Sequence, residues 1–157
     1  MSTRGTYQIT MQHTEKDGKI LTHRDIDICI YSQNDNYPSG AVEKFKNTLK
    51  LQKELKEQLN NTDFIECFIA ANIREYGYME ITGSYAQYHN GYPDYLLFSN
   101  KQRDTAYAYE ILISDDIYLK CYKWGNNITT NECERVLYYD GLLMDFINNT
   151  AIEFLDK

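Results

Sequence analysis

Apolar and polar residues alternate in two early stretches of the chain, residues 5–13 and 24–31. A period of two puts the apolar side chains on one face and is typical of a half-buried strand. Asp17-Gly18, between the two stretches, favours a hairpin turn. The two stretches are therefore predicted to pair as a hairpin. The apolar positions that define the buried face are Tyr7, Ile9, Met11, Ile26, Ile28 and Ile30.

Three other stretches show the spacing of amphipathic helices. Residues 40–59 carry a narrow apolar stripe among Lys, Glu and Gln, with Ser39 as the expected N-cap. A second, more apolar helix is expected to start after Asp63 and to end at Gly77, because glycine suits the position after a helix. Residues 141–155 have the apolar spacing of a third, core-facing helix.

Between the second and third helices the sequence favours strands separated by turns. The turn signals are Asn90-Gly91, Asp115-Asp116 and residues 125–127. This order predicts the α+β class, with an antiparallel sheet of about five to seven strands and three helices mainly on one face. The length of 157 residues suits a single domain, residues 1–157. The expected strands are residues 78–84, 85–89, 95–98, 106–114, 117–124 and 136–139.

The charge and the aromatic content narrow the classes of partner. The 16 basic and 23 acidic residues give a net charge of −7. This balance argues against nucleic acid, which usually requires a basic face, and allows an acidic surface that meets a basic partner. The chain also has 15 Tyr. Tyrosine is favoured at protein interfaces, but it also lines strands, so its abundance fits either role.

Nothing in the sequence supports a metal, a cofactor or a membrane span. The four Cys and three His include no C-x-x-C pair, which argues against zinc. The common catalytic and nucleotide-binding motifs are also missing, so no catalytic residue is assigned and enzymatic activity is left open. Without an apolar span or a signal-peptide pattern, we expect a cytoplasmic protein with reduced thiols.

The two prolines of the chain stand in similar turns, Tyr37-Pro38 and Tyr92-Pro93. The first turn lies in residues 31–40, between a predicted strand and the longest predicted helix. In one interpretation each turn simply ends a strand. In the other, the turns flank one cleft in which tyrosines stack on a ligand and amides bind it. The residues of this second interpretation are Arg4, Asn34, Asp35, Asn36, Tyr37, His89, Asn90 and Tyr92.

Residues 1–7, Met-Ser-Thr-Arg-Gly-Thr-Tyr, and residues 35–40, Asp-Asn-Tyr-Pro-Ser-Gly, resemble a group of small phage and prophage proteins. These proteins begin with a Thr-Arg segment and carry an Asp-Gly-Tyr-Pro-x-Gly turn after a strand. Here Asn36 replaces the usual glycine. The resemblance covers about the first quarter of the chain and implies a genomic setting, not a reaction. It also implies a pairing of Arg4 with Asp35, either as a structural clamp or with Arg4 as an anion site.

Three functions are compatible with these observations. The first is a phage or prophage protein that is not catalytic and occludes a host protein, such as a defence factor, in the bacterial cytoplasm. The second is a protein that sequesters or cleaves a nucleotide-derived signal between the two Tyr-Pro turns. The third is a structural module that forms a homo-oligomer. The first is our leading hypothesis, because it accounts for the acidic charge, the many tyrosines and the resemblance together.

Overall fold

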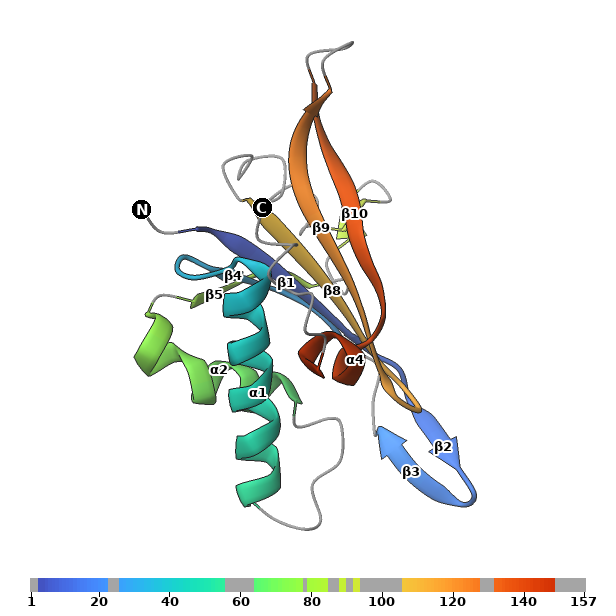
Figure 1. The fold of residues 1–157 in the computed structure, drawn as a ribbon. Helices are drawn as coiled ribbons and strands as arrows, with labels where there is room; N and C mark the ends of the chain where they lie inside the picture. Colours follow the sequence, from blue (N-terminus) through green and yellow to red (C-terminus); the bar gives the residue numbers. More distant parts are fainter. Residues whose placement is uncertain are drawn as a thin grey trace.

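The computed structural model describes residues 3–22, 26–55, 64–77, 79–84, 88–89, 92–93, 106–127 and 132–148. Its main feature is a six-stranded sheet with the strand order β10-β9-β8-β1-β4-β5 (Figure 1). The N-terminal strand, β1, therefore lies in the interior of the sheet. The strands are β1 Gly5–Met11, β4 Ile26–Ser32, β5 Met79–Ser84, β8 Tyr107–Ile113, β9 Ile117–Asn127 and β10 Glu132–Leu142.

Four of the five strand pairings are antiparallel, and the pairing of β1 with β8 is parallel. The predicted hairpin of β1 with β4 is confirmed, with Ile9 opposite Ile28. The α+β class is confirmed as well, and six strands fall within the predicted number. The parallel pair differs from the antiparallel prediction. It forms because the chain returns to β1 only after both long helices, the kind of crossover that parallel neighbours require.

Two short hairpins stand outside the main sheet. β2 Thr14–Lys16 pairs with β3 Lys19–Thr22. Their turn contains Asp17 at φ 53° and Gly18 at φ 77°, so the predicted Asp-Gly turn is confirmed. The two short strands that it joins were not predicted. β6 Tyr88–His89 pairs with β7 Tyr92–Pro93 on either side of the predicted Asn-Gly turn. The other strand predicted nearby, residues 95–98, lies outside the described residues.

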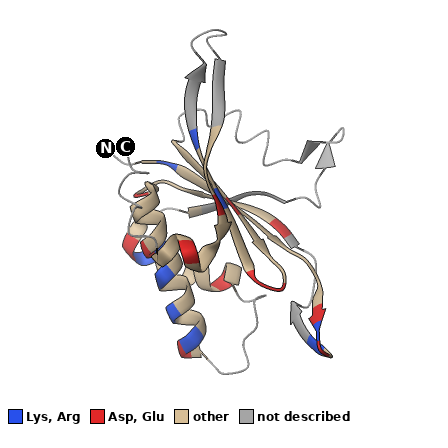
Figure 2. Ribbon diagram, turned by 45° about the vertical axis from the view of Figure 1, so that its right-hand side comes forward, with Lys and Arg blue, Asp and Glu red and all other residues tan. Residues whose placement is uncertain are grey.

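In the described ranges the helices are α1 Pro38–Leu55, α2 Phe64–Tyr76 and α4 Leu143–Asn148. Figures 1 and 2 show all three on the same side of the main sheet, as the sequence predicts. We call this side the inner face of the sheet and the opposite side the outer face. Helix α1 is mainly basic, with Lys at 44, 46, 50 and 53 and Glu at 43 and 54, and all of these except the buried Lys44 are exposed (Figure 2).

Helix α1 begins earlier than predicted, at Pro38. The Ala41 amide donates a hydrogen bond of 2.8 Å to the Tyr37 carbonyl, so Ser39 lies within the first turn and is not the cap. Proline suits this position because its missing N–H would have no helical partner. Helix α2 ends as predicted, with Gly77 at φ 77° directly after it.

The last two strands are longer than predicted. β9 continues through residues 125–127, where the sequence indicates a turn, and β10 begins well before residue 136. Helix α4 consequently begins at Leu143, later than the predicted residue 141. In the β9–β10 ladder Gly125 pairs with Glu134, and such cross-strand pairing outweighs the local turn preference of Gly and Asn. Residues 149–155 of the predicted helix lie outside the described residues.

The inner face and the helices enclose a core centred on Tyr7. Its ring stacks on Tyr109 with the ring centres 4.9 Å apart, and it packs against Phe68 at 4.8 Å. Phe45 meets the same ring edge-on at 5.9 Å. All four rings are buried. For these strand tyrosines the structural interpretation of the high Tyr content is therefore correct.

A buried asparagine fixes the packing of α1 against α2. The Asn72 side-chain amide donates to the Lys44 carbonyl at 3.2 Å and to the Phe68 carbonyl at 2.8 Å. Asn47 donates to the Asn72 side-chain oxygen at 3.2 Å. Because these polar atoms are paired inside an otherwise apolar contact, they specify one relative position of the two helices.

Candidate functional site

The junction that the sequence singles out, residues 31–40, is organised around Asn36, which is fully buried. Its side-chain amide donates to the Thr3 carbonyl at 2.8 Å and to the Ser32 carbonyl at 2.9 Å. Its side-chain oxygen accepts from the Tyr7 hydroxyl at 2.7 Å, and its main-chain carbonyl accepts from Tyr109 at 2.7 Å. Asn36 therefore joins the N-terminal segment, β4 and β8 from inside the core.

A buried lysine holds the same junction from the helix side. The Lys44 ammonium donates to the Asn34 carbonyl at 2.8 Å and to the Asp35 carbonyl at 2.6 Å. It also lies 4.2 Å from the centre of the Tyr76 ring. Burial lowers the pKa of Lys44 from 10.5 to about 8, while Asp35 and Glu75 act in the opposite direction. The ammonium is desolvated but well partnered, which is typical of a structural clamp.

Close contacts leave little room in this junction. A Cβ added to Gly40 would overlap the main-chain carbonyl of Asp35, and one added to Gly5 would lie 2.6 Å from the Asn36 Cβ. Asp35 itself has a φ of 55°, in the left-handed region that Asp tolerates better than most residues. We call Asn36, Lys44 and their partners the junction network. Its geometry favours the structural interpretation of the first Tyr-Pro turn.

The proposed binding residues of this turn therefore differ in what they can offer a ligand. Tyr37 has 44% of its surface exposed, and its ring meets Tyr107 edge-on with the ring centres 5.7 Å apart. Asn34 donates its side-chain amide to the Tyr76 carbonyl at 3.0 Å. The Arg4 carbonyl accepts from the Ala106 amide at 2.9 Å, which fixes the main chain next to the junction. The pairing of Arg4 with Asp35 stays a prediction.

The second Tyr-Pro turn is described only in part. His89 and Tyr92 are directly opposite each other in the β6–β7 pair, so the turn brings their main chains together. Their side chains and Asn90 lie outside the described part of the structure. Whether the two Tyr-Pro turns share one cleft stays a prediction.

β10 is an edge of the main sheet as far as the structure describes it, and it exposes three consecutive apolar residues (Figure 1). Val136, Leu137 and Tyr138 have 45%, 48% and 44% of their surface exposed. The register shifts between Leu137 and Tyr139, which leaves Tyr138 without a partner residue in β9. Natural sheets usually protect such an edge with charge or proline. This edge could not be predicted from the sequence, because the strand order is not visible in it.

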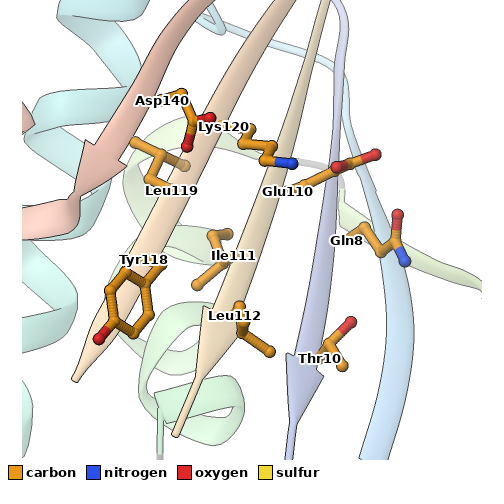
Figure 3. Close-up of a pocket in the computed structure, with 9 residues that line it drawn as sticks. All are labelled: Gln8, Thr10, Glu110, Ile111, Leu112, Tyr118, Leu119, Lys120 and Asp140. Carbon is orange, nitrogen blue, oxygen red and sulfur yellow. The ribbon is translucent and has the colours of Figure 1, made fainter. Parts of the chain in front are cut away.

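The outer face of the sheet carries a second group of polar residues. Gln8 pairs with Glu110, Glu110 with Lys120, and Lys120 with Asp140, so the four residues form one row across four strands. A cavity of about 200 Å³ lies beside this row (Figure 3). The alternation of each strand assigns these residues to the polar face. The antiparallel pairings of β8 with β9 and of β9 with β10 bring Glu110, Lys120 and Asp140 together. The parallel pairing of β1 with β8 adds Gln8, and nothing in the sequence indicates that pairing.

Other classes of site receive no support from the described residues. They contain no group of three or more His, Cys, Asp or Glu placed to hold a metal ion. The side chains of Cys29, Cys67 and Cys121 are buried and are not joined in a disulfide. None of the helices in the described ranges combines the length and the apolar character needed to cross a bilayer. A scan against protein-family models finds no match, and searches of curated proteins and of solved structures find none either.

Proposed function

We propose that this chain is a binding protein without catalytic function, which occludes a partner protein through the exposed edge of β10. The observation that carries the proposal is the run of Val136, Leu137 and Tyr138 on that edge. An extended segment of a partner can add to such an edge as a further strand. Main-chain hydrogen bonds then supply affinity, and alternate side chains supply specificity.

The surroundings of the edge fit this role. Met144, near the start of α4, exposes 49% of its surface and follows β10 directly in the chain. The register shift at Tyr138 interrupts the regular ladder, and such bulges reduce indiscriminate pairing of edges. A partner that makes both strand contacts and apolar contacts would therefore be favoured over a second sheet edge of arbitrary sequence.

The identity of the partner is proposed from the sequence. The net charge of −7 favours a partner with a basic surface, because opposite potentials speed the encounter. The resemblance to phage and prophage proteins favours a bacterial host protein, for instance a defence factor in the cytoplasm. Occlusion needs only a stable complex, which agrees with the lack of a catalytic motif in the sequence.

A pair of matched variants tests this proposal. Leu137→Lys places a charge on the β10 edge, and Ile73→Lys makes the same change on α2, where Ile73 is 45% exposed. Exposed substitutions of this kind usually change stability by less than about 0.5 kcal/mol. The wild type and Ile73→Lys should capture the same protein from bacterial lysate and bind it on titration, whereas Leu137→Lys should not. Equal capture by all three proteins, or capture by none, would reject the proposal.

A second candidate function rests on the exposed ring of Tyr37. A half-exposed tyrosine beside the junction is able to stack on a nucleobase, as a protein that sequesters or cleaves a nucleotide-derived signal requires. Nucleotides should then raise the melting temperature of the wild type but not of Tyr37→Ala. Chromatography of the nucleotide after incubation separates binding from cleavage. If no nucleotide raises the melting temperature of the wild type, this candidate is rejected.

A further inference from the structure

The cavity on the outer face is bordered by a row of charged and polar side chains (Figure 3). Neighbouring strands are about 4.8 Å apart, so cross-strand partners stand side by side. Glu110 lies between Gln8 on β1 and Lys120 on β9, and Asp140 on β10 ends the row. Two carboxylates therefore flank one ammonium along this border.

The other side of the cavity is less polar, with Leu112 and Tyr118 next to the hydroxyl-bearing Thr10. Leu112 and Tyr118 pair across β8 and β9, one step along the strands from the charged row. The Tyr118 hydroxyl donates to an Asp115 carboxylate oxygen at 3.1 Å, which orients the ring. A ligand in the cavity would thus meet charge on one side and an aliphatic and aromatic surface on the other.

A third carboxylate stands next to the cavity. Asp27, on β4, accepts hydrogen bonds from Thr10 at 3.1 Å and from Gln8 at 3.4 Å, and both donors line the cavity. Burial raises the pKa of Asp27 to about 6, and the nearby Glu110 raises it further, while the two hydrogen bonds lower it. At neutral pH Asp27 is mostly ionised. The carboxylates at this site then outnumber the single ammonium of Lys120.

We propose that this cavity binds a primary ammonium group on a small apolar body, with the ammonium at Glu110 and the body against Leu112 and Tyr118. The excess of carboxylate favours a cation over an anion. The volume of about 200 Å³ is below the range of roughly 300–1,000 Å³ of drug-sized pockets, so the ligand is small. The site shares β10 with the proposed docking edge through Asp140, but its other lining residues lie on β1, β8 and β9, and it goes beyond the function proposed above.

Calorimetric titration of the full chain with three probes tests the proposal. Phenethylamine carries the ammonium alone, 3-phenylpropionate the carboxylate alone, and phenylalanine both. Phenethylamine should bind and 3-phenylpropionate should not. If phenylalanine binds as well as phenethylamine, the natural ligand belongs to the amino acids, and if it binds less well, to the simple amines. Binding of 3-phenylpropionate as tight as that of phenethylamine, or no binding of phenethylamine, would overturn the proposal.

Isosteric variants locate the ammonium. Glu110→Gln should weaken phenethylamine binding about tenfold, the loss expected for one charge-assisted hydrogen bond. Lys120→Met removes a positive charge that repels the ligand ammonium, so it should strengthen phenethylamine binding. Glu54→Gln, an exposed carboxylate on α1, is the matched control and should bind as the wild type does. Melting curves confirm that each variant is folded. Unchanged binding in a folded Glu110→Gln variant would contradict the proposed position of the ammonium.

Discussion

Two groups of polar residues lie back to back on β1 and β8. On the inner face Tyr7 and Tyr109, a register pair, donate their hydroxyls to Asn36. One residue further along, Gln8 and Glu110 form the next register pair and line the outer cavity. The junction network is closed, because the side chain of Asn36 and the ammonium of Lys44 are used by other parts of the same chain. The cavity row also has partners within the chain, since Gln8 donates to Asp27 and Glu110 accepts from the Tyr122 hydroxyl, both at 3.4 Å, but this row borders the outer cavity.

This difference separates structural polar residues from candidate binding residues. A buried polar atom must be paired, and when the partners are internal the pair specifies the fold and offers nothing to a ligand. Asn36 and Lys44 belong to this kind, although the first was a candidate binding residue on sequence grounds. A carboxylate that borders a cavity can accept from a ligand in addition to its partners within the chain, because its two oxygens offer about four acceptor positions. The following variants test this contrast, in order of decreasing expected effect.

The largest effect is expected from Asn36→Leu. The change removes the side-chain partners of Tyr7, Thr3 and Ser32 and leaves buried polar atoms unpaired. We expect a loss of about 3–5 kcal/mol in the free energy of unfolding, measured by urea denaturation. A loss below about 1 kcal/mol would mean that the junction network does not hold the fold together.

Lys44→Met should have the next largest effect. The variant keeps most of the aliphatic length but leaves the Asn34 and Asp35 carbonyls without their charged donor. We expect a loss of about 2–4 kcal/mol in the free energy of unfolding. Removing the buried charge is itself stabilising, so it offsets part of the loss caused by the unpaired carbonyls. The same urea titration measures it. Lys50→Met, an exposed lysine on the same helix, is the matched control and should lose little.

Asp27→Asn should change the free energy of unfolding by a smaller amount than Lys44→Met, and should raise it. The pKa of Asp27 is about 6 in the folded protein against an ordinary value of 3.8. The folded state thus binds the Asp27 proton more tightly than the unfolded state does. The contribution of Asp27 to the free energy of unfolding therefore falls as pH rises from about 4 to 6, and this loss of stability persists at higher pH. The variant should therefore be more stable at pH 7, by less than about 1 kcal/mol because the group is half exposed.

Comparison of Asp27→Asn with the wild type across pH separates the effect of Asp27 on stability from that of the other carboxylates. The difference in unfolding free energy between Asp27→Asn and the wild type should grow from pH 4 to pH 6 and then stay constant. A difference that is the same at both pH values would show that Asp27 ionises normally in the folded protein.

The smallest effect is expected from Lys120→Ala in the cavity row. Lys120 is exposed on the outer face, so its loss should change the free energy of unfolding by less than about 0.5 kcal/mol. Thermal or urea denaturation measures this directly. A loss comparable to that of Lys44→Met would show that the cavity row stabilises the fold as the junction network does, and the contrast would fail.

The sequence predicts local structure well because that structure depends on neighbouring residues. The β1–β4 hairpin, the Asp17-Gly18 turn and the end of α2 at Gly77 all follow from alternation and from backbone preferences. The pairing of β1 with β8 depends on contacts between distant parts of the chain, and alternation does not reveal it. Neither the outer cavity nor the β10 edge could therefore be predicted.

The junction is a second example of contacts between distant parts of the chain that the sequence does not reveal. Turn-forming residues and a proline mark residues 31–40 in the sequence as a junction between a strand and a helix, and the structure confirms that junction between β4 and α1. Their partners were not visible: Tyr7, Tyr109 and Lys44 approach Asn36 and its neighbours from three different elements. A polar residue in a turn is usually solvated, and only the packing of those elements makes Asn36 a buried one.

The interior position of β1 also has a consequence for biosynthesis. Of the strands of the main sheet, β1 is synthesised before the others, and β4 and β5 can join it on one side early. Its other neighbour, β8, is made only after both long helices. A nascent chain therefore displays one edge of β1, with its free main-chain groups, for most of its synthesis. Folding is expected to be slow for a chain of this size and to depend on protection of that edge until β8 emerges.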